Sequence, residues 1–432
     1  MRKIILSIVL LLAETGMARA AALSEEVVGT YADIGLAGFQ DALTAAQRLD
    51  AVIDALLAAP GEQTLKDARA AWIQARIPYQ QAEVFLSGDK VADSREGRIH
   101  AWPPDEAMID YADASGYGAL QPDDKDYDVS NAIAGKQLNV GGRIVDAGSV
   151  SADLLNEVLR EAGGDAADAL VGFNAIEFLL WGQDSGIGPD PADRVGSSGE
   201  RHAGTRLYTD FDLEHCTGGQ CARRRDYLKV LSQLLLCNLE GIVVNWQEEG
   251  QARHELARDP ETGLSTMLTG LGSLSYGELA QERAKLGLTW HDAERDQDEF
   301  SGNAHDAHYY SQLGMMNAYN GRYTRLDGSV VSGPSLSDLV RARDARLDQE
   351  MQQGMECAYQ ALLAIKQRAE TIETYDQMIA KGNAEGNALI QTAIDSLVAQ
   401  TRLIERIALA LGLHDVRVEG LTGLMESDSA AR

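Results

Sequence analysis

The chain has 432 residues, of which 45% are hydrophobic, and a formal net charge of −28 at pH 7. Its length allows two or three domains with a large core. The acidic balance argues against a nucleic-acid-binding protein, which needs a basic surface, and suits solubility and the attraction of cations.

Residues 1–20 have the pattern of a secretory signal peptide. The positive residues Arg2 and Lys3 precede an apolar run over residues 4–12, and residues 18–20 read Ala-Arg-Ala, which resembles a cleavage site. The apolar run is too short to span a bilayer. We therefore expect a cleaved, exported protein of the periplasm or cell envelope that does not span the membrane.

Most of the remaining chain predicts α-helices, because apolar residues recur at helical spacing and strand patterns are rare. Three stretches rich in Gly, Asp, Ser and Pro are expected to be loops or short helices: 88–150, 183–220 and 320–334. The fold class that follows is all-α. The expected helices are at about 24–58, 64–86, 151–163, 165–182, 222–250, 275–290, 303–319, 335–368 and 386–411.

The predicted helix 64–86 carries an unusual face. Trp72, Arg76, Tyr79 and Glu83 follow at steps of four, three and four, which places them on one side. This face is consistent with a structural ion pair or with the polar lining of a cleft. Pro78 is expected to kink or end the helix.

Residues 98–106 (RIHAWPPDE) read as an ordered loop, because the Trp-Pro-Pro sequence cannot continue a helix. His100, Asp105 and Glu106 are candidate ligands in this loop, and ordinary surface groups are the alternative.

The predicted helix 165–182 is apolar on nearly every face and should be buried all round. It nevertheless carries Asn174 and Glu177, which are neighbours on one face. An unpaired buried carboxylate is costly, so Glu177 needs a cation, a metal or a proton. A structural ion pair and a ligand site both satisfy this need.

Four cysteines remain after the predicted cleavage site. In an oxidising compartment Cys216 and Cys221 are expected to form a disulfide that closes a glycine-rich turn. A zinc site that includes His215 is the alternative. For Cys237 and Cys357, free thiols and a long-range bridge both remain open.

Residues 292–308 contain six acidic residues and two histidines. Asp298, Glu299 and His305 are candidate metal ligands there, because oxygen and imidazole donors suit a divalent or ferric ion. An acidic start of a helix, favoured by the helix dipole, is the alternative.

Several of these segments together resemble the imelysin-like family, in particular its iron-regulated protein A-like branch. The matching segments are 98–106 (RIHAWPPDE), 172–184 (GFNAIEFLLWGQD), 277–283 (GELAQER), 300–305 (FSGNAH) and 375–377 (YDQ). The resemblance implies two fused helical bundles, each similar to a four-helix bundle, with a cleft between them. On this basis we expect an N-terminal bundle at 21–250 and a C-terminal bundle at 251–432.

The resemblance also implies an exported protein linked to iron uptake or iron response. The family takes its name from a metallopeptidase with a G-x-H-x-x-E motif, which aligns with Gly172, Asn174 and Glu177. Asn174 therefore stands where the motif has histidine, and a carboxamide is a weaker metal ligand than an imidazole.

We therefore predict a non-enzymatic binding protein for iron, another divalent metal, a small ligand or a peptide. A metallopeptidase and an envelope protein that binds a protein partner are the alternatives. The predicted metal ligands are Glu177, Asn174, Glu83, Asp105, Glu106, Asp298, Glu299 and His305. The residues expected to line the cleft or form ion pairs are Arg76, Trp72, Tyr79 and His100.

Overall fold

The computed structural model describes residues 2–86, 97–100, 102, 104, 106–110, 131–140, 143–155, 170–182, 204, 206–292, 297–414, 416 and 418. Within these residues the protein is mostly helical with two short β-hairpins, which confirms the predicted all-α class.

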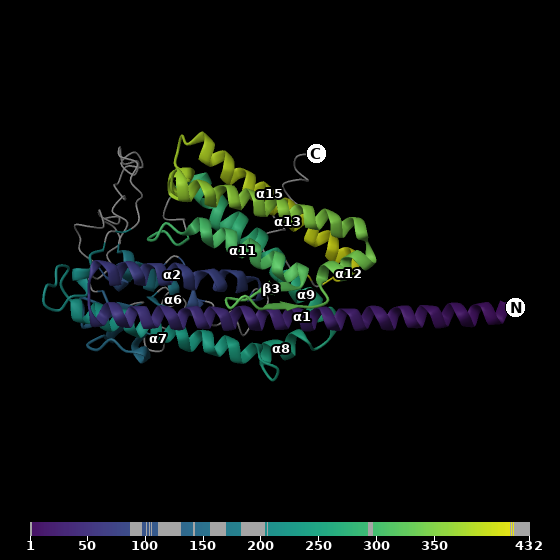
Figure 1. Cartoon of the computed structure of the whole chain (residues 1–432), viewed down its shortest axis with the longest axis horizontal. Coiled ribbons are helices and arrows are strands. Elements are labelled where there is room, and N and C mark those ends of the chain that lie inside the picture. The colour runs from purple at the N-terminus through teal and green to yellow at the C-terminus, as the bar shows by residue number, and fades with distance from the viewer. Residues whose placement is uncertain are drawn as a thin grey trace.

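Helix α1 (Arg2–Ala58) forms the long axis of the first half, and its first part projects beyond the rest of the molecule (Figure 1). Helices α2 (Glu62–Ala82) and α7 (Cys221–Trp246) pack along α1, and α6 (Gly172–Trp181) packs against both of them. The described core residues of α1 begin at Val27. The shorter elements of this half are η1 (Glu83–Phe85), α4 (Glu106–Ile109), β1 (Gln137–Val140), β2 (Arg143–Asp146), η4 (Tyr208–Asp210) and α8 (Gln251–Leu256).

The second half is built on α11 (Ala304–Asn320), α13 (Ala345–Thr371) and α15 (Ala384–Leu411), with α13 packed between the other two. The π-helix η5 (Ser273–Lys285) packs on α15. The two halves meet where α11 packs on α2 (Figure 1). The remaining elements are α9 (Pro260–Gly272), α10 (Leu286–Trp290), β3 (Arg322–Thr324), β4 (Val330–Ser332), α12 (Leu336–Arg343) and α14 (Tyr375–Ile379).

The apolar core is continuous across the two halves. One cluster of buried side chains extends from Val27 in α1 to Ala408 in α15, and a smaller cluster around Tyr375 lies where α13, α14 and α15 meet. The predicted boundary at residue 250 therefore does not coincide with a break in the described core. The division into two bundles stays a prediction.

The segment Cys221–Leu256 is long and apolar enough to cross a membrane by length and composition alone. However, 56% of its most apolar window is buried inside the protein. Packing in the core is a sufficient physical reason for its apolar composition.

Three local predictions differ from the structure. Helix α2 does not end at Pro78 but continues to Ala82, so of the two expectations for this proline the end of the helix is wrong. The single helix expected over 335–368 is two helices, because the side chain of Asp344 caps α13 by accepting from the backbone of Arg346 (3.0 Å) and Leu347 (3.1 Å). The expected loop at 320–334 contains the hairpin β3–β4, which is held from outside by the carboxylate of Asp41.

The hairpin β1–β2, within the expected loop at 88–150, was also not predicted. The helix expected at 151–163 lies largely outside the described residues.

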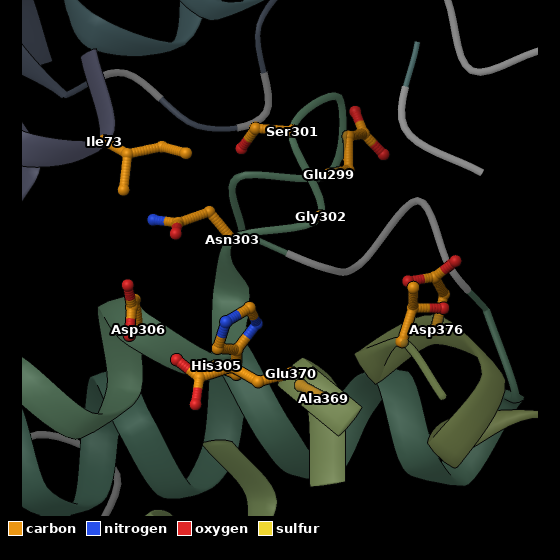
Figure 2. A pocket seen from close by; sticks show the side chains of 11 residues that line it. Ile73, Glu299, Ser301, Gly302, Asn303, His305, Asp306, Ala369, Glu370 and Asp376 are labelled. Atoms are coloured by element: carbon orange, nitrogen blue, oxygen red, sulfur yellow. The ribbon is translucent and has the colours of Figure 1, made fainter. Parts of the chain in front are cut away.

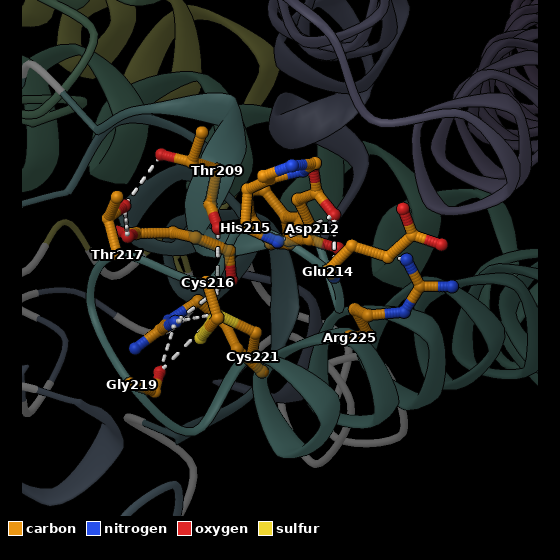
Figure 3. The surroundings of a disulfide bond; sticks show 12 residues. Thr209, Asp212, Glu214, His215, Cys216, Thr217, Gly219, Cys221 and Arg225 are labelled. Atoms are coloured by element: carbon orange, nitrogen blue, oxygen red, sulfur yellow. Dashed lines mark hydrogen bonds and ion pairs between the residues drawn. A yellow bond between two sulfur atoms is a disulfide. The ribbon is translucent and has the colours of Figure 1, made fainter.

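The disulfide between Cys216 and Cys221 is confirmed, and it closes the turn that leads into α7 (Figure 3). Because the two sulfur atoms are bonded to each other, the alternative zinc site is wrong. His215 points its Nδ1 at Asp212 Oδ2 instead, at 3.0 Å. Cys237 and Cys357 are free, exposed thiols rather than a long-range bridge.

Candidate functional site

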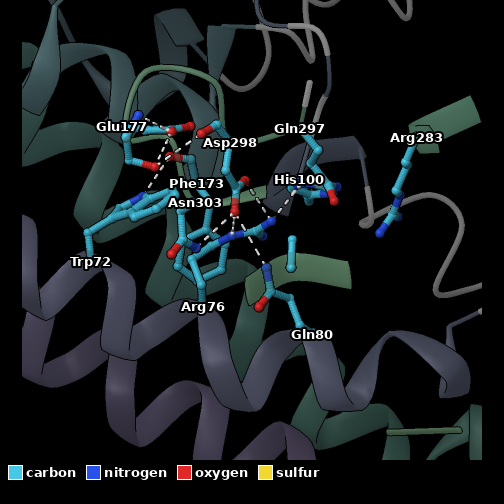
Figure 4. A network of polar contacts seen from close by, with 12 residues as sticks. Trp72, Arg76, Gln80, His100, Phe173, Glu177, Arg283, Gln297, Asp298 and Asn303 are labelled. Atoms are coloured by element: carbon cyan, nitrogen blue, oxygen red, sulfur yellow. Dashed lines mark hydrogen bonds and ion pairs between the residues drawn. The ribbon is translucent and has the colours of Figure 1, made fainter. Parts of the chain in front are cut away.

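The predicted face of α2 lies in the interior of the protein, where it meets α6 and the turn 297–303 (Figure 4). The indole nitrogen of Trp72 donates to the backbone oxygen of Phe173 (2.9 Å) and so ties α2 to the first turn of α6. Gly172 begins that turn with φ +83°, and a Cβ at this position would collide with the backbone of Ile99. Glycine is therefore required where His100 pairs with Gly172 through the backbone.

Arg76 and Asp298 form a fully buried ion pair at the centre of this region (Figure 4). Arg76 Nη2 donates to Asp298 Oδ1 at 2.8 Å, and Nε donates to Oδ2 at 3.1 Å. The guanidinium carbon lies 5.3 Å from the ring centre of Phe173 and 5.7 Å from the rings of Trp72 and Tyr79. The aromatic faces stabilise the Arg76 cation, and the bidentate contact with Asp298 fixes the orientation of the guanidinium.

Asp298 also organises the turn that carries it. Its Oδ2 accepts from Gln80 Nε2 (3.4 Å) and Asn303 Nδ2 (3.3 Å), while its backbone oxygen accepts from the Asn303 backbone nitrogen (3.1 Å). The residue has φ +60°, a left-handed conformation that aspartate adopts more readily than most residues. The turn 297–303 is therefore built around a carboxylate that is held by α2.

Glu177 is fully buried beside this pair and braces the same turn (Figure 4). Its Oε1 accepts from the backbone nitrogen (2.8 Å) and the hydroxyl (2.6 Å) of Ser301. Burial and then the charge of Asp298 raise the pKa of Glu177 well above its ordinary value, although the bonds from Ser301 oppose this. The other oxygen, Oε2, has no hydrogen-bond partner in the described part of the chain, and neither has Oδ1 of the buried Asn174.

His100 connects the ion pair to a second set of charges. Its Nε2 lies 3.1 Å from Arg76 Nη2 and 2.8 Å from Gln297 Nε2. Burial, and then the charges of Arg76 and Arg283, lower the pKa of His100 well below its ordinary value. Because a guanidinium can only donate, Nε2 of the neutral ring accepts, and the proton lies on Nδ1, which is 3.9 Å from Glu83 Oε1.

Glu83 links three elements that are distant in the chain. Its Oε2 accepts from Arg283 Nη1 of η5 (3.2 Å) and from Ser311 Oγ of α11 (2.6 Å). Its other oxygen has no hydrogen-bond partner among the residues that the structure describes. Arg283 also pairs with Glu278 (3.0 Å), so the segment 277–283 contributes both an arginine and a glutamate to the network.

Residues of the turn 297–303 also border a pocket of about 280 Å³ (Figure 2). Ser301 and Asn303 line it, and these same residues donate to Glu177 and Asp298. The buried polar network thus holds one wall of the pocket. The lining residues are Ile73, Glu299, Ser301, Gly302, Asn303, His305, Asp306, Ala369, Glu370, Thr374 and Asp376.

His305, Asp306 and Glu370 converge at this pocket from the first turn of α11 and the last turn of α13 (Figure 2). One nitrogen and two carboxylate oxygens lie within 4.8 Å of one another. Burial, as the largest cause, lowers the pKa of His305, which favours the neutral ring. Its Nδ1 is buried and has no hydrogen-bond partner within the described ranges. This donor set fits a borderline or hard metal ion.

The predicted site residues separate into two groups. Trp72, Arg76, Tyr79, Glu83, His100, Asn174, Glu177 and Asp298 all belong to the buried network or pack beside it. Glu299 and His305 line the pocket instead. Glu106 begins α4 and is not among the described residues that line the pocket. Asp105 lies outside the described residues.

Several residues of the site were not predicted. Gln80 stands one turn after Arg76 on the same face of α2, so its position was readable from spacing. The roles of Ser301 and Asn303 were not predicted, although both stand in the segment 300–305. Nothing local indicated Glu370, because it reaches His305 only through the packing of α13 on α11.

The comparisons with known proteins agree with this architecture. A family model described as imelysin (peptidase M75) matches residues 35–404. A crystal structure of a candidate iron-regulated protein A precursor from Parabacteroides distasonis is similar in fold, with a TM-score of 0.61 and 19% identity, over 90% of this chain and 95% of that chain. An imelysin-like protein from Psychrobacter arcticum is similar with a TM-score of 0.52 and 15% identity, over 91% and 97%. The comparison with curated proteins finds no match.

Proposed function

The chain belongs to the imelysin family, and on that premise we propose that it is an exported binding protein of the cell envelope, linked to iron uptake or iron response. Its proposed ligand is a metal ion that binds in the pocket through His305, Asp306 and Glu370. One observation carries this proposal: an imidazole nitrogen and two carboxylate oxygens from two different helices lie within 4.8 Å of one another. The net charge of −28 would help to attract a cation.

The buried network supports binding by holding the pocket in shape. Ser301 and Asn303 line the pocket, and each donates to a buried carboxyl group behind it. Groups whose rotamers are locked by hydrogen bonds present a ligand site with little loss of entropy on binding. In this proposal Glu177 and Asp298 support the site and do not contact the ion.

Calorimetric titration of the mature protein with zinc, and with ferrous ion under anoxic conditions, tests the metal site. We expect His305→Ala to weaken binding by about a hundredfold or more, since loss of an outer partner of a ligand already costs ten- to a hundredfold. His254→Ala is the matched control, because His254 is exposed on α8. Equal binding by the two variants, or no heat from either metal with the unmodified protein, would refute the proposed site.

Export is the second part of the proposal and has its own test. The part of α1 that contains residues 2–20 projects from the molecule (Figure 1), and the described core begins later, at Val27. Removal of residues 1–20 would therefore leave the described core intact. We expect the protein to be recovered from the periplasmic fraction with an N-terminus near Ala21. An uncleaved protein in the cytoplasm would contradict this.

A metallopeptidase is the alternative that the family name suggests. Asn174 stands at the position of the motif histidine, and Glu177 is fully buried with Oε1 bonded to Ser301. A base that activates water needs access to solvent and to the metal. The surroundings of Glu177 therefore favour a structural role, in which it holds the turn 297–303, over the role of a general base. Chelator-sensitive cleavage of a peptide library by the purified protein would favour the peptidase instead.

A further inference from the structure

A lysine side chain already lies between the two carboxylates of the candidate metal site. Lys366 Nζ donates to Asp306 Oδ1, and it donates to Glu370 Oε1 at 2.8 Å. The same ammonium lies 5.8 Å from the ring centres of Tyr309 and Tyr310. Lys366 stands one turn before Glu370 on α13, so the helix itself brings the ammonium to the carboxylate.

The charge of Lys366 is stable in this position. The ammonium donates to both Asp306 and Glu370, and a lysine side chain is ordinarily protonated at neutral pH. The two carboxylates therefore share a bound cation at neutral pH. A metal ion within a few ångströms of that ammonium would be repelled by it and would compete for the same oxygens.

We propose that Lys366 is an internal cation that occupies the Asp306–Glu370 pair in the metal-free protein, and that an incoming metal ion must displace its ammonium. This inference rests on the proposed function and adds the residue that sets the affinity and selectivity of the site. The displacement is sterically feasible, because the lysine stem is flexible and its side chain is 16% exposed.

Displacement of the lysine favours some metals over others. Zinc and ferrous ions gain the imidazole nitrogen of His305, which gives them a ligand that the ammonium leaves unused in this structure. Calcium and magnesium ions prefer oxygen and gain chiefly the two carboxylates that Lys366 already holds. Lys366 therefore weakens the binding of calcium and magnesium ions more strongly than the binding of zinc or ferrous ions.

Calorimetric titration of Lys366→Met with zinc and calcium ions tests this inference. Loss of two charge-assisted hydrogen bonds to a partly exposed ammonium should tighten zinc binding by about tenfold. It should also give measurable calcium binding, which we do not expect of the unmodified protein. The metal-free variant should unfold at a lower temperature, because its carboxylates repel each other, and zinc should restore the midpoint. Lys366→Gln, which keeps a donor without the charge, replaces the methionine variant if that one does not fold. Lys66→Met, at an exposed position of α2, is the matched control.

The outcomes separate this inference from the proposed function. An unchanged zinc affinity with a lowered unfolding temperature would show that Lys366 is only structural and would overturn the inference. If His305→Ala abolishes zinc binding in that case, the proposed metal site stands. If the unmodified protein binds no zinc but Lys366→Met does, the proposed function fails, and the displacement inference fails with it, because the ammonium then blocks the site and is not displaced. If His305→Ala leaves zinc binding unchanged both in the unmodified protein and in the Lys366→Met variant, the proposed metal site is wrong.

Discussion

Replacement of Arg76 by methionine tests whether the buried ion pair holds the turn 297–303 against α2. The substitution keeps an unbranched apolar stem among the rings of Trp72, Tyr79 and Phe173, and it removes the cation. Asp298 then remains fully buried, and its side-chain donors among the described residues are Gln80 at 3.4 Å and Asn303 at 3.3 Å.

The expected loss in the free energy of unfolding is about 3–5 kcal/mol, the typical cost of leaving one member of a buried pair without its partner. That corresponds to a change of about a hundredfold to several thousandfold in the ratio of folded to unfolded protein. Urea unfolding of the mature protein, followed by circular dichroism and tryptophan fluorescence, measures this loss.

Two further variants make the test specific. Asp298→Asn keeps the shape and tolerates the left-handed backbone, so Arg76→Met/Asp298→Asn should recover about 2–3 kcal/mol relative to the sum of the single losses. Arg346→Met removes the ion pair between Arg346 and Glu350, which has a similar length but lies at the surface. This variant should change the free energy of unfolding little. If Arg76→Met costs no more than Arg346→Met, or the double variant is strictly additive, the buried pair does not stabilise the turn.

Three other perturbations give distinct expectations. Gly172→Ala should lower the free energy of unfolding by several kcal/mol, because the new Cβ meets the Ile99 backbone at φ +83°. Gly219→Ala, at φ +67° in open space, should lower it by about 1 kcal/mol. Equal losses would exclude the collision as the cause. Glu177 has a raised pKa in the folded protein, so the native state keeps a proton that the unfolded chain releases above its ordinary pKa of 4.5. Stability should therefore fall as pH rises from about 4.5, relative to Glu177→Gln, and parallel pH profiles of the two proteins would contradict this. Replacement of both Cys216 and Cys221 by serine should lower the free energy of unfolding, measured in urea, by about 2 kcal/mol, because the bridge closes a short loop. Cys237→Ser should leave the free energy of unfolding unchanged.

Much of the helical architecture was predictable because its signals are local. Apolar residues at helical spacing mark α2, α7, α11 and α15, and the face of Trp72, Arg76, Tyr79 and Glu83 follows from counting along one helix. The disulfide was predictable for the same reason, since its two cysteines are five residues apart. The hairpin β3–β4 was missed because its main anchor, Asp41, lies on α1, far away in the chain.

The candidate site shows the same division between local and distant information. The sequence by itself determined that Glu177 is buried, because its helix is apolar on every side, and that a buried carboxyl group needs a partner or a proton. Only the tertiary structure decided which partners it has: Ser301 from the turn 297–303 and, beside it, the Arg76–Asp298 pair. The grouping of His305, Asp306, Lys366 and Glu370 is likewise a result of α11 packing on α13. Burial follows from the pattern of one helix, whereas the identity of a polar partner depends on which distant segments pack against it.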